Sequence, residues 1–215
     1  MAAHPTRRLA RWLAITEIVL FATAAIALGW YAVVRVSAAR DQATWTRELE
    51  QHAETISERS LPATAQRRRL EKGALIGRIE LPRLGVSAIA REGADAVTLR
   101  RSVGHVPETA LPGEPGNAAL AGHRDTFFRG LKDVREGDHV VVTTLAGRHQ
   151  YIVREMRVVE PSDVSVLDPT DEAMLTLVTC YPFNYVGAAP QRFVVRAALV
   201  GSPVPAVATA MSTRR

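Results

Sequence analysis

The chain has 215 residues, enough for one domain of ordinary size with additional segments, and its formal net charge is +5. Its lysines and arginines are scattered rather than gathered into a basic stripe interleaved with aromatic residues, which argues against a nucleic-acid-binding protein. Its single cysteine, Cys180, excludes an intramolecular disulfide and a structural zinc site built on several thiolates. The surroundings of that thiol are therefore the most informative part of the sequence.

The segment 12–34 is a long apolar stretch whose only charged residue is Glu17. As a helix it would be about 35 Å long, which is enough to cross the roughly 30 Å hydrocarbon core of a bilayer. A cleaved signal peptide has a shorter apolar core followed by a small-residue cleavage site, whereas this run continues past Ala27 through Tyr31. We therefore predict a retained transmembrane helix over residues 12–34.

The segments around this helix indicate how the chain is organised. Three arginines precede the helix and two follow it closely, so the positive-inside rule favours a cytoplasmic N-terminus (1–11) and an extracytoplasmic remainder. Residues 35–72 are rich in Ala, Gln, Glu and Arg, which predicts a polar stalk. A solvent-facing helix is expected over 40–60 of this stalk, ended by Pro62. Residues 201–215 are predicted to be a disordered tail.

Residues 73–200 have the pattern of a β protein, with short apolar or alternating runs separated by Gly- and Pro-containing turns. Seven or eight short strands at this spacing predict a mainly β fold, a closed or nearly closed barrel with one or two helical turns around 95–102. The predicted strands cover 74–79, 86–90, 118–121, 139–144, 150–154, 174–179 and 193–200.

Cys180 stands at the end of one predicted strand, in the run Leu-Thr-Leu-Val-Thr-Cys-Tyr-Pro of 175–182. Pro182 cannot donate to a strand ladder and is expected to end it. A thiol at the open end of a strand is held firmly and can still face a groove. A free cysteine is more often a small buried hydrophobe, so position alone leaves both interpretations open.

A cysteine nucleophile needs a base or an ion-pair partner, and two of the six histidines are candidates. His123 begins a loop directly after a strand that ends at Gly122, the same placement that Cys180 has on its own strand. His105 is a rival by residue type. The other four lie before the apolar segment, in the stalk or on the predicted surface of a hairpin: His4, His52, His139 and His149.

Arg192 lies twelve residues after Cys180, beyond a loop that contains glycine and proline. If the two flanking strands are antiparallel neighbours, Arg192 stands across the ladder from Cys180. Its guanidinium can then hydrogen-bond an oxyanion or hold substrate carbonyls, although a surface arginine on a strand is the alternative. Asp125, two residues after His123, can orient the imidazole, but its commoner role is a loop hydrogen bond. We leave Asp125 out of the catalytic set.

Taken together, these residues resemble the sortase family. The Thr-Leu-Val-Thr-Cys stretch is similar to the sortase signature around the nucleophile, and an upstream Ala-Gly-His-Arg and a downstream arginine match the other two positions. The runs that begin at His123 (His-Arg-Asp-Thr-Phe-Phe) and at Cys180 (Cys-Tyr-Pro-Phe) are most similar to class D sortases. The resemblance covers 73–200 and implies a sortase-type β-barrel of seven or eight strands.

The resemblance also implies a chemistry. Cys180 would attack a Thr–Gly-type or Thr–Ala-type bond in the C-terminal sorting signal of a secreted protein, and His123 would protonate the leaving amine. Arg192 would stabilise the oxyanion or anchor the substrate. An amine acceptor, from a cell-wall peptide or another protein, would then resolve the thioacyl intermediate. Such a protein works at the cell membrane with its catalytic domain outside, which agrees with the charge pattern around 12–34.

Two departures limit what the resemblance implies. The stalk has no Asp-Pro-aromatic lid motif, which disfavours a pilin-polymerising enzyme with a latching lid. The acidic residues are dispersed, whereas some sortases bind calcium through acidic clusters, so we predict no metal and no cofactor.

Other classes of protein fit the sequence less well. L,D-transpeptidase-like enzymes place a glycine before the cysteine and an arginine two residues after it, whereas Thr179 and Pro182 occupy those positions here. Papain-like peptidases place the cysteine before the histidine. Two alternatives stay open: a sortase-fold cysteine peptidase that mainly hydrolyses, and a non-catalytic anchored β domain that binds the cell wall and buries Cys180.

Overall fold

The computed structural model describes residues 5–56 and 70–200. The predicted helix end at Pro62 and the predicted tail 201–215 lie outside the described residues. The chain divides into two compact units, Met1–Asp41 and Gln42–Arg215, and each is described by itself.

A single helix, α1 (Pro5–Ile56), contains both the predicted transmembrane segment and most of the helix predicted in the stalk. Its stretch Ile15–Val33 is long and apolar enough to cross a membrane, and none of it is buried. The hydroxyl of Thr16 donates to the carbonyl oxygen of Leu13, so this polar group is satisfied within the helix. Length, composition and internal hydrogen bonding therefore all suit a membrane span.

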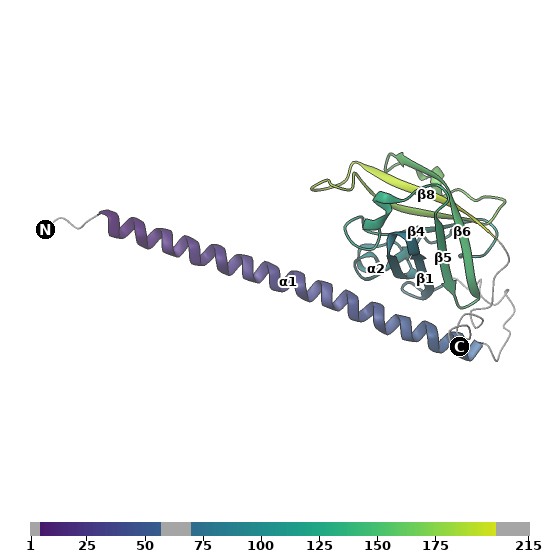
Figure 1. Cartoon of the computed structure of the whole chain (residues 1–215), viewed down its shortest axis with the longest axis horizontal. Helices are drawn as coiled ribbons and strands as arrows, with labels where there is room; N and C mark the ends of the chain where they lie inside the picture. The colour runs from purple at the N-terminus through teal and green to yellow at the C-terminus, as the bar shows by residue number, and fades with distance from the viewer. Residues whose placement is uncertain (1–4, 57–69, 201–215) are drawn as a thin grey trace. The chain divides into compact units, whose positions relative to one another are not determined.

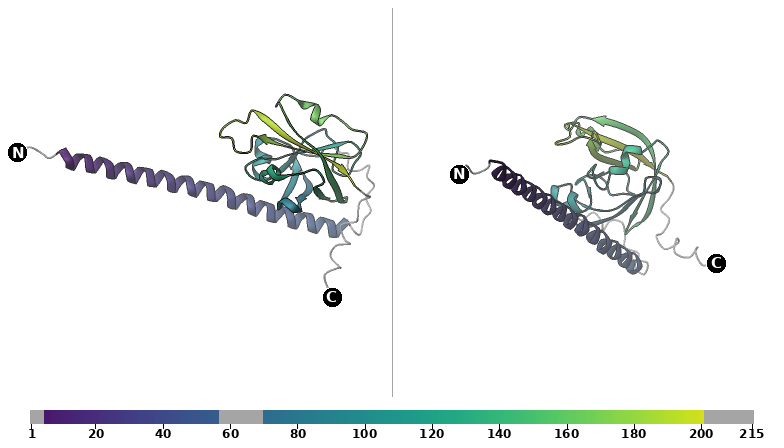
Figure 2. Two further views of the ribbon diagram at one scale, coloured as in Figure 1. Left: turned by 45° about the horizontal axis from the view of Figure 1, so that its top comes forward. Right: turned by 60° about the vertical axis from the view of Figure 1, so that its left-hand side comes forward.

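Eight strands form one sheet that closes on itself as a barrel, as Figures 1 and 2 show. In chain order they are β1 (Leu75–Leu81), β2 (Val86–Glu92), β3 (Val103–His105), β4 (Asn117–Ala121), β5 (His139–Thr144), β6 (Gly147–Val159), β7 (Met174–Tyr181) and β8 (Gln191–Leu199). Around the barrel the order is β1-β2-β3-β4-β7-β8-β6-β5. The prediction of a closed barrel with seven or eight strands is confirmed.

Apolar side chains on the inner face of the sheet fill the barrel. Along β7, Leu175 and Leu177 point inward and are fully buried, as the two-residue alternation of a strand requires. Burial of each such side chain stabilises the fold by about 1.5–3 kcal/mol. Phe128, from the segment after β4, completes the core, and a Cβ added at Gly122 would lie 2.7 Å from its ring. The end of β4 can therefore pack on this ring only because residue 122 is glycine.

Within the barrel, α2 (Ala96–Arg101) lies where helical turns were predicted. The carboxylate of Asp95 caps it by accepting from the amides of Val97 and Thr98. A hydrogen bond from the Thr98 hydroxyl, together with these amides, lowers the pKa of Asp95 to about 2. The structure adds three short 3-10 helices: η2 (Pro82–Leu84), η3 (Arg129–Asp133) and η4 (Val164–Leu167).

Two strands differ from their predicted extents. β3 was missed because it has only three residues, Val103–His105, too few to show an alternating pattern. β6 has 13 residues where five were predicted. A register shift between Val153 and Glu155 interrupts its alternation, and the charged pair at 154–155 there has the pattern of a turn rather than of a strand.

One histidine prediction is wrong. His139 is exposed as expected, but His149 faces the barrel interior and is 6% exposed. The side chains of His149, Tyr151 and Val153 all lie on the buried face of β6, so strand alternation carries the imidazole inward. The imidazole packs against Gly113, which has φ +94° and no side chain to collide with the ring. This contact between Gly113 and His149 could not be predicted from the sequence.

Because His149 is buried, we expect the barrel to lose stability in mild acid. Desolvation lowers the pKa of this imidazole below its ordinary value of 6.5. The unfolded chain then binds a proton more readily than the folded one, so the stability present above pH 6.5 is lost as the pH falls below it. Pulse proteolysis in urea at pH 7.5 and 5.5 measures this loss. The loss should shrink in His149→Gln and persist in His139→Gln; equal losses in all three proteins would contradict the assignment.

Candidate active site

The parallel pairing of β4 with β7 brings two strand ends to one edge of the barrel. In this pairing Ala121 lies opposite Val178, and the carboxyl ends of parallel strands meet at the same edge. Two hydrogen bonds extend the match: the Gly122 amide donates to the Val178 carbonyl at 3.1 Å, and the Thr179 hydroxyl donates to the Gly122 carbonyl at 2.7 Å. The residues that directly follow Gly122 and Thr179 are His123 and Cys180, the two candidates for catalysis.

Cys180 and Arg192 are direct cross-strand partners in the antiparallel pair β7–β8. Their side chains therefore leave the same face of the sheet with Cβ atoms about 4.5–5.5 Å apart. Cys180 is partly exposed. The Nη1 of Arg192 donates to the carbonyl oxygens of Ala189 at 3.3 Å and Gln191 at 3.0 Å. Its Nε and Nη2 make no hydrogen bond to the described part of the chain, so they can donate to a ligand.

His123 follows Gly122 at the same edge, and its side chain is exposed. Its carbonyl oxygen accepts from the amides of Thr126 and Phe128, so a turn anchored on the buried Phe128 ring holds the backbone of this residue. The structure thus pairs Cys180 with Arg192 and places His123 on the neighbouring strand end. A partly exposed thiol, an exposed imidazole and a guanidinium with free donors can together support acyl transfer.

The rival histidine lies inside the structure. His105 is 2% exposed, its Nδ1 is 2.6 Å from Glu92 Oε2, and its Nε2 is 2.9 Å from the carbonyl oxygen of Ala110. Both ring nitrogens are engaged, so His105 links β2, β3 and the segment that follows β3. Asp125 is exposed, and its carboxylate lies 3.4 Å from Nε of Arg124 rather than orienting His123.

Three aromatic rings close the barrel behind the candidate site. Tyr181 stacks on Phe193 with ring centroids 6.1 Å apart, and Phe183 meets both rings edge-on. Tyr181 follows Cys180 in an extended strand, so these rings lie on the opposite face of the sheet from the thiol. They pack the ends of β7 and β8 against each other on the inner face.

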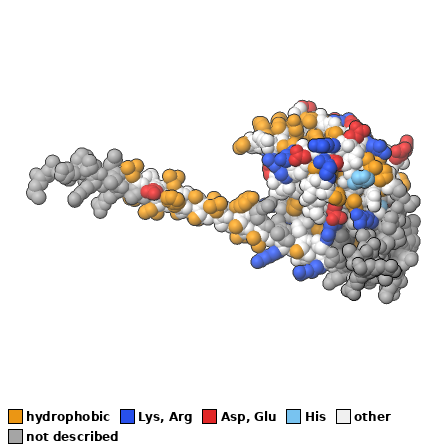
Figure 3. All heavy atoms as spheres, viewed as in Figure 1, with side chains coloured by type: hydrophobic (Ala, Val, Ile, Leu, Met, Phe, Trp, Pro, Cys, Tyr) orange, Lys and Arg blue, Asp and Glu red, His pale blue; other side chains and the backbone are white. Residues whose placement is uncertain are grey.

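Apolar side chains are exposed beside the same edge. In Figure 3 hydrophobic atoms gather at the end of the barrel from which the loop between β7 and β8 projects in Figure 1. Tyr185 is exposed in that loop and Val186 is 97% exposed, while Val164 is exposed in the segment after β6. The last residue of β6, Val159, pairs with Arg192, so that segment begins at the same edge. Exposed apolar groups on two loops suit a peptide ligand.

The described residues contain no group of three or more His, Cys, Asp or Glu side chains that could hold a metal ion.

Comparison with known proteins agrees with this geometry. Residues 79–200, more than half of the chain, match the sortase domain family. The chain belongs to the sortase family. Sortase D of Bacillus subtilis is 36% identical to it over 126 residues, which are 58% of this chain and 64% of that protein. A Clostridium perfringens sortase D5 described as a transpeptidase is 31% identical with a TM-score of 0.57, covering 71% of this chain and 98% of the solved chain.

These similarities support the expected resemblance to class D sortases. Sortase E of Streptomyces avermitilis is also similar, at 32% identity with a TM-score of 0.53, covering 63% of this chain and 94% of the solved chain. The chain spans 64% of sortase D of Bacillus subtilis and 51% of sortase A of Listeria monocytogenes. The residues matched by the family model, 79–200, include His123, Cys180 and Arg192.

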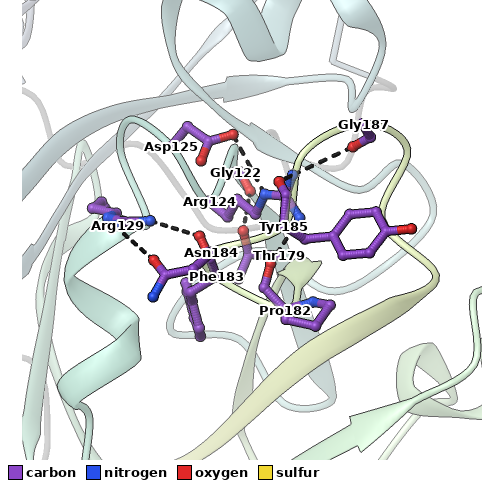
Figure 4. A network of polar contacts seen from close by, with 10 residues as sticks. All are labelled: Gly122, Arg124, Asp125, Arg129, Thr179, Pro182, Phe183, Asn184, Tyr185 and Gly187. Atoms are coloured by element: carbon purple, nitrogen blue, oxygen red, sulfur yellow. Dashed lines mark hydrogen bonds and ion pairs between the residues drawn. The ribbon is translucent and has the colours of Figure 1, made fainter.

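Sequence reasoning missed two arginines of this sortase that lie beside the site. Arg124 and Arg129 follow His123 and donate to the loop that follows Cys180, as Figure 4 shows. Arg124 is 6% exposed. The only sign of Arg124 in the sequence was its position next to His123. Its partners are backbone carbonyls about 60 residues away, and backbone carbonyls have no sequence signature.

Proposed function

We propose that the chain is a membrane-anchored cysteine transpeptidase that joins secreted proteins to an amine acceptor at the cell surface. The observation that carries the proposal is the direct cross-strand pairing of Cys180 with Arg192 at the edge where His123 follows β4. Membership of the sortase family supports the same reaction class.

In the first half-reaction the thiol of Cys180 gives its proton to His123, and its sulfur attacks the carbonyl carbon of a Thr–Gly-type or Thr–Ala-type peptide bond in a sorting signal. The tetrahedral intermediate carries a negative oxygen, and Arg192 would stabilise it by hydrogen bonds from Nε and Nη2, which make none to the described residues. The carbon–nitrogen bond then breaks as His123 donates a proton to the leaving amine. The products are a thioester on Cys180 and the released C-terminal fragment.

In the second half-reaction an amine of a cell-wall peptide or of another protein attacks the thioester. His123 accepts the proton of the incoming amine, the carbon–sulfur bond breaks, and a new amide forms while Cys180 leaves as a thiol or thiolate. A thiol becomes a good nucleophile near neutral pH when a base or a cation lies beside it. His123 and Arg192 are the groups proposed for that task.

The apolar part of α1 supports the location of the reaction. We infer that Ile15–Val33 anchors the protein in the cell membrane as a single span. The arginines before this stretch favour a cytoplasmic N-terminus, with the barrel on the extracytoplasmic side where secreted substrates occur.

The test uses the full chain in detergent and a library of pentapeptides that end in Thr-Gly or Thr-Ala, with glycine or alanine amides as acceptors. Mass spectrometry should find a thioacyl adduct on Cys180 and a ligated product for at least one peptide. Hydrolysis without ligation would favour the sortase-fold peptidase instead. The absence of any adduct with the whole library would overturn the proposal.

Arg192→Ala is expected to lower kcat/KM about 10²–10³-fold, because an oxyanion donor is lost while the thiol remains. Steady-state cleavage of the best library peptide measures the effect. Arg196→Ala is the matched control, since Arg196 lies four residues further along β8 on the same face and pairs with Thr176 rather than Cys180. Similar losses in the two variants would show that the effect is not specific to position 192.

A further inference from the structure

The loop 182–190 joins the strand end that carries Cys180 to the strand start that carries Arg192. It contains no helix or strand in the described structure. A peptide attached to Cys180 must pass beside it, because the loop leaves β7 two residues after the thiol. What holds this loop in shape therefore bears on how a peptide binds.

Arginine side chains hold the loop by its oxygen atoms. Arg124 donates from Nη1 to the Pro182 carbonyl at 2.7 Å and from Nη2 to the carbonyls of Tyr185 at 2.5 Å and Gly187 at 3.4 Å. Its guanidinium carbon also lies 5.9 Å from the centre of the Tyr185 ring. One side chain thus contacts the first residue of the loop and two residues further along it, as Figure 4 shows.

Arg129, at the start of η3, adds a second attachment. Its Nη1 donates to the Phe183 carbonyl at 2.6 Å, and its Nη2 donates to Oδ1 of Asn184 at 3.0 Å. Unlike Arg124, Arg129 is exposed. Both arginines come from the segment that begins at His123, so the loop after the thiol and the segment after the imidazole are joined by side-chain hydrogen bonds.

The burial of Arg124 makes its attachment the stronger one. A buried guanidinium is costly unless hydrogen bonds compensate it, and here backbone carbonyls provide most of that compensation. The one carboxylate near it, Asp125, is itself exposed, so its charge is screened by solvent. A lysine cannot replace this planar fork, because a single ammonium group does not reach three separate carbonyls with the same geometry.

We propose that Arg124 is a positioning residue that preforms the loop 182–190 as one wall of the acyl-donor site. The wall presents the exposed side chains of Tyr185 and Val186 to an extended peptide with apolar side chains before the scissile bond. This inference rests on the proposed transpeptidase function. The ligand class is the acyl-donor peptide rather than the amine acceptor, because the loop flanks the thiol to which the acyl group is attached.

The first test is the kinetics of Arg124→Gln in the full chain with the best peptide of the library. We expect KM for the peptide to rise about tenfold or more, because the peptide must order a loose loop, while kcat changes less than about threefold. The reacting groups are carried by strand ends, so alkylation of Cys180 by iodoacetamide should proceed at nearly the native rate. An unchanged KM would overturn the proposal. So would a fall in the alkylation rate as large as the fall in kcat/KM for the peptide.

Arg124→Lys separates geometry from charge. If the fork geometry matters, the lysine variant keeps a raised KM; full recovery of the native KM would assign the effect to charge and overturn the proposal. Arg129→Ala tests the loop without removing a buried group and should raise KM about threefold. Arg100→Gln is the matched control, since Arg100 is an exposed arginine on α2 bonded to its own helix, and it should leave KM unchanged.

Hydrogen–deuterium exchange gives a readout that does not need a substrate. Amides of 183–189 should exchange faster in Arg124→Gln than in the native chain and in Arg100→Gln, while amides of β7 stay protected. If the native chain cleaves no peptide, the proposed function fails, and exchange then decides only whether Arg124 holds the loop in shape. Unchanged exchange in the loop would overturn this inference.

Discussion

Replacing Cys180 with alanine is expected to abolish thioacyl-adduct formation and peptide cleavage completely. No other thiol exists in the chain, so no second nucleophile of this type can substitute for it. The side chain is partly exposed at a strand end, and its loss should change the free energy of unfolding by less than about 1 kcal/mol. Mass spectrometry of the trapped adduct and a cleavage assay measure the loss of activity, and urea unfolding measures the change in stability.

Because the chain has a single cysteine, labelling by a thiol reagent reports on Cys180 alone. A methanethiosulfonate or vinyl-sulfone reagent should label the folded native chain once and leave Cys180→Ala unlabelled. Cys180→Ser tests whether a hydroxyl can replace the thiol, and it should be inactive because serine needs a stronger base for the same attack. A native thiol that resists the reagent would instead support a non-catalytic β domain that binds the cell wall.

Replacing His123 with alanine is expected to lower kcat/KM about 10²–10⁴-fold, the usual contribution of a general acid–base. The thiol should still react with iodoacetamide, and the pH dependence of kcat/KM should lose one limb. Added imidazole at millimolar concentration should restore part of the activity if the lost group moves a proton.

His105 provides the comparison for this variant. Because Glu92 is buried against its Nδ1, His105→Ala should destabilise the fold by about 1–3 kcal/mol while sparing the chemistry of the molecules that remain folded. Activity must therefore be normalised to the amount of reactive Cys180, measured by titration with the thiol reagent. If the normalised loss equals that of His123→Ala, the base has been assigned to the wrong histidine.

The strand that carries the thiol could be predicted because its signals are local. The strand and its end are defined within a few residues by the alternating Leu175 and Leu177, by the β-branched residues between and after them, and by Pro182 after the cysteine. The apolar stretch of α1 was equally readable, since a membrane span is a property of composition over about 20 residues. Strand β3 carried no such signal, because three residues cannot show a period.

Only part of the candidate site could be predicted from the sequence. The spacing of Cys180 and Arg192 predicted a cross-strand pair once antiparallel strands were assumed, and the register confirms their pairing. The roles of these residues stay predictions. His105 and His123 could not be separated by residue type, because what separates them is burial: one imidazole is enclosed by Glu92 and Ala110, and the other is exposed at a strand end.

The sequence by itself indicated the apolar helix, the mainly β character of the barrel and Cys180 as the candidate nucleophile, because each depends on residue type over short stretches. Only the tertiary structure decided that β4 and β7 are parallel neighbours, that His149 is buried beside Gly113, and that Arg124 holds the loop after Cys180. These facts depend on groups far apart in the chain. A backbone carbonyl or a glycine looks the same in the sequence wherever it occurs. The sequence therefore does not show which side chain will contact it, and only the folded structure does.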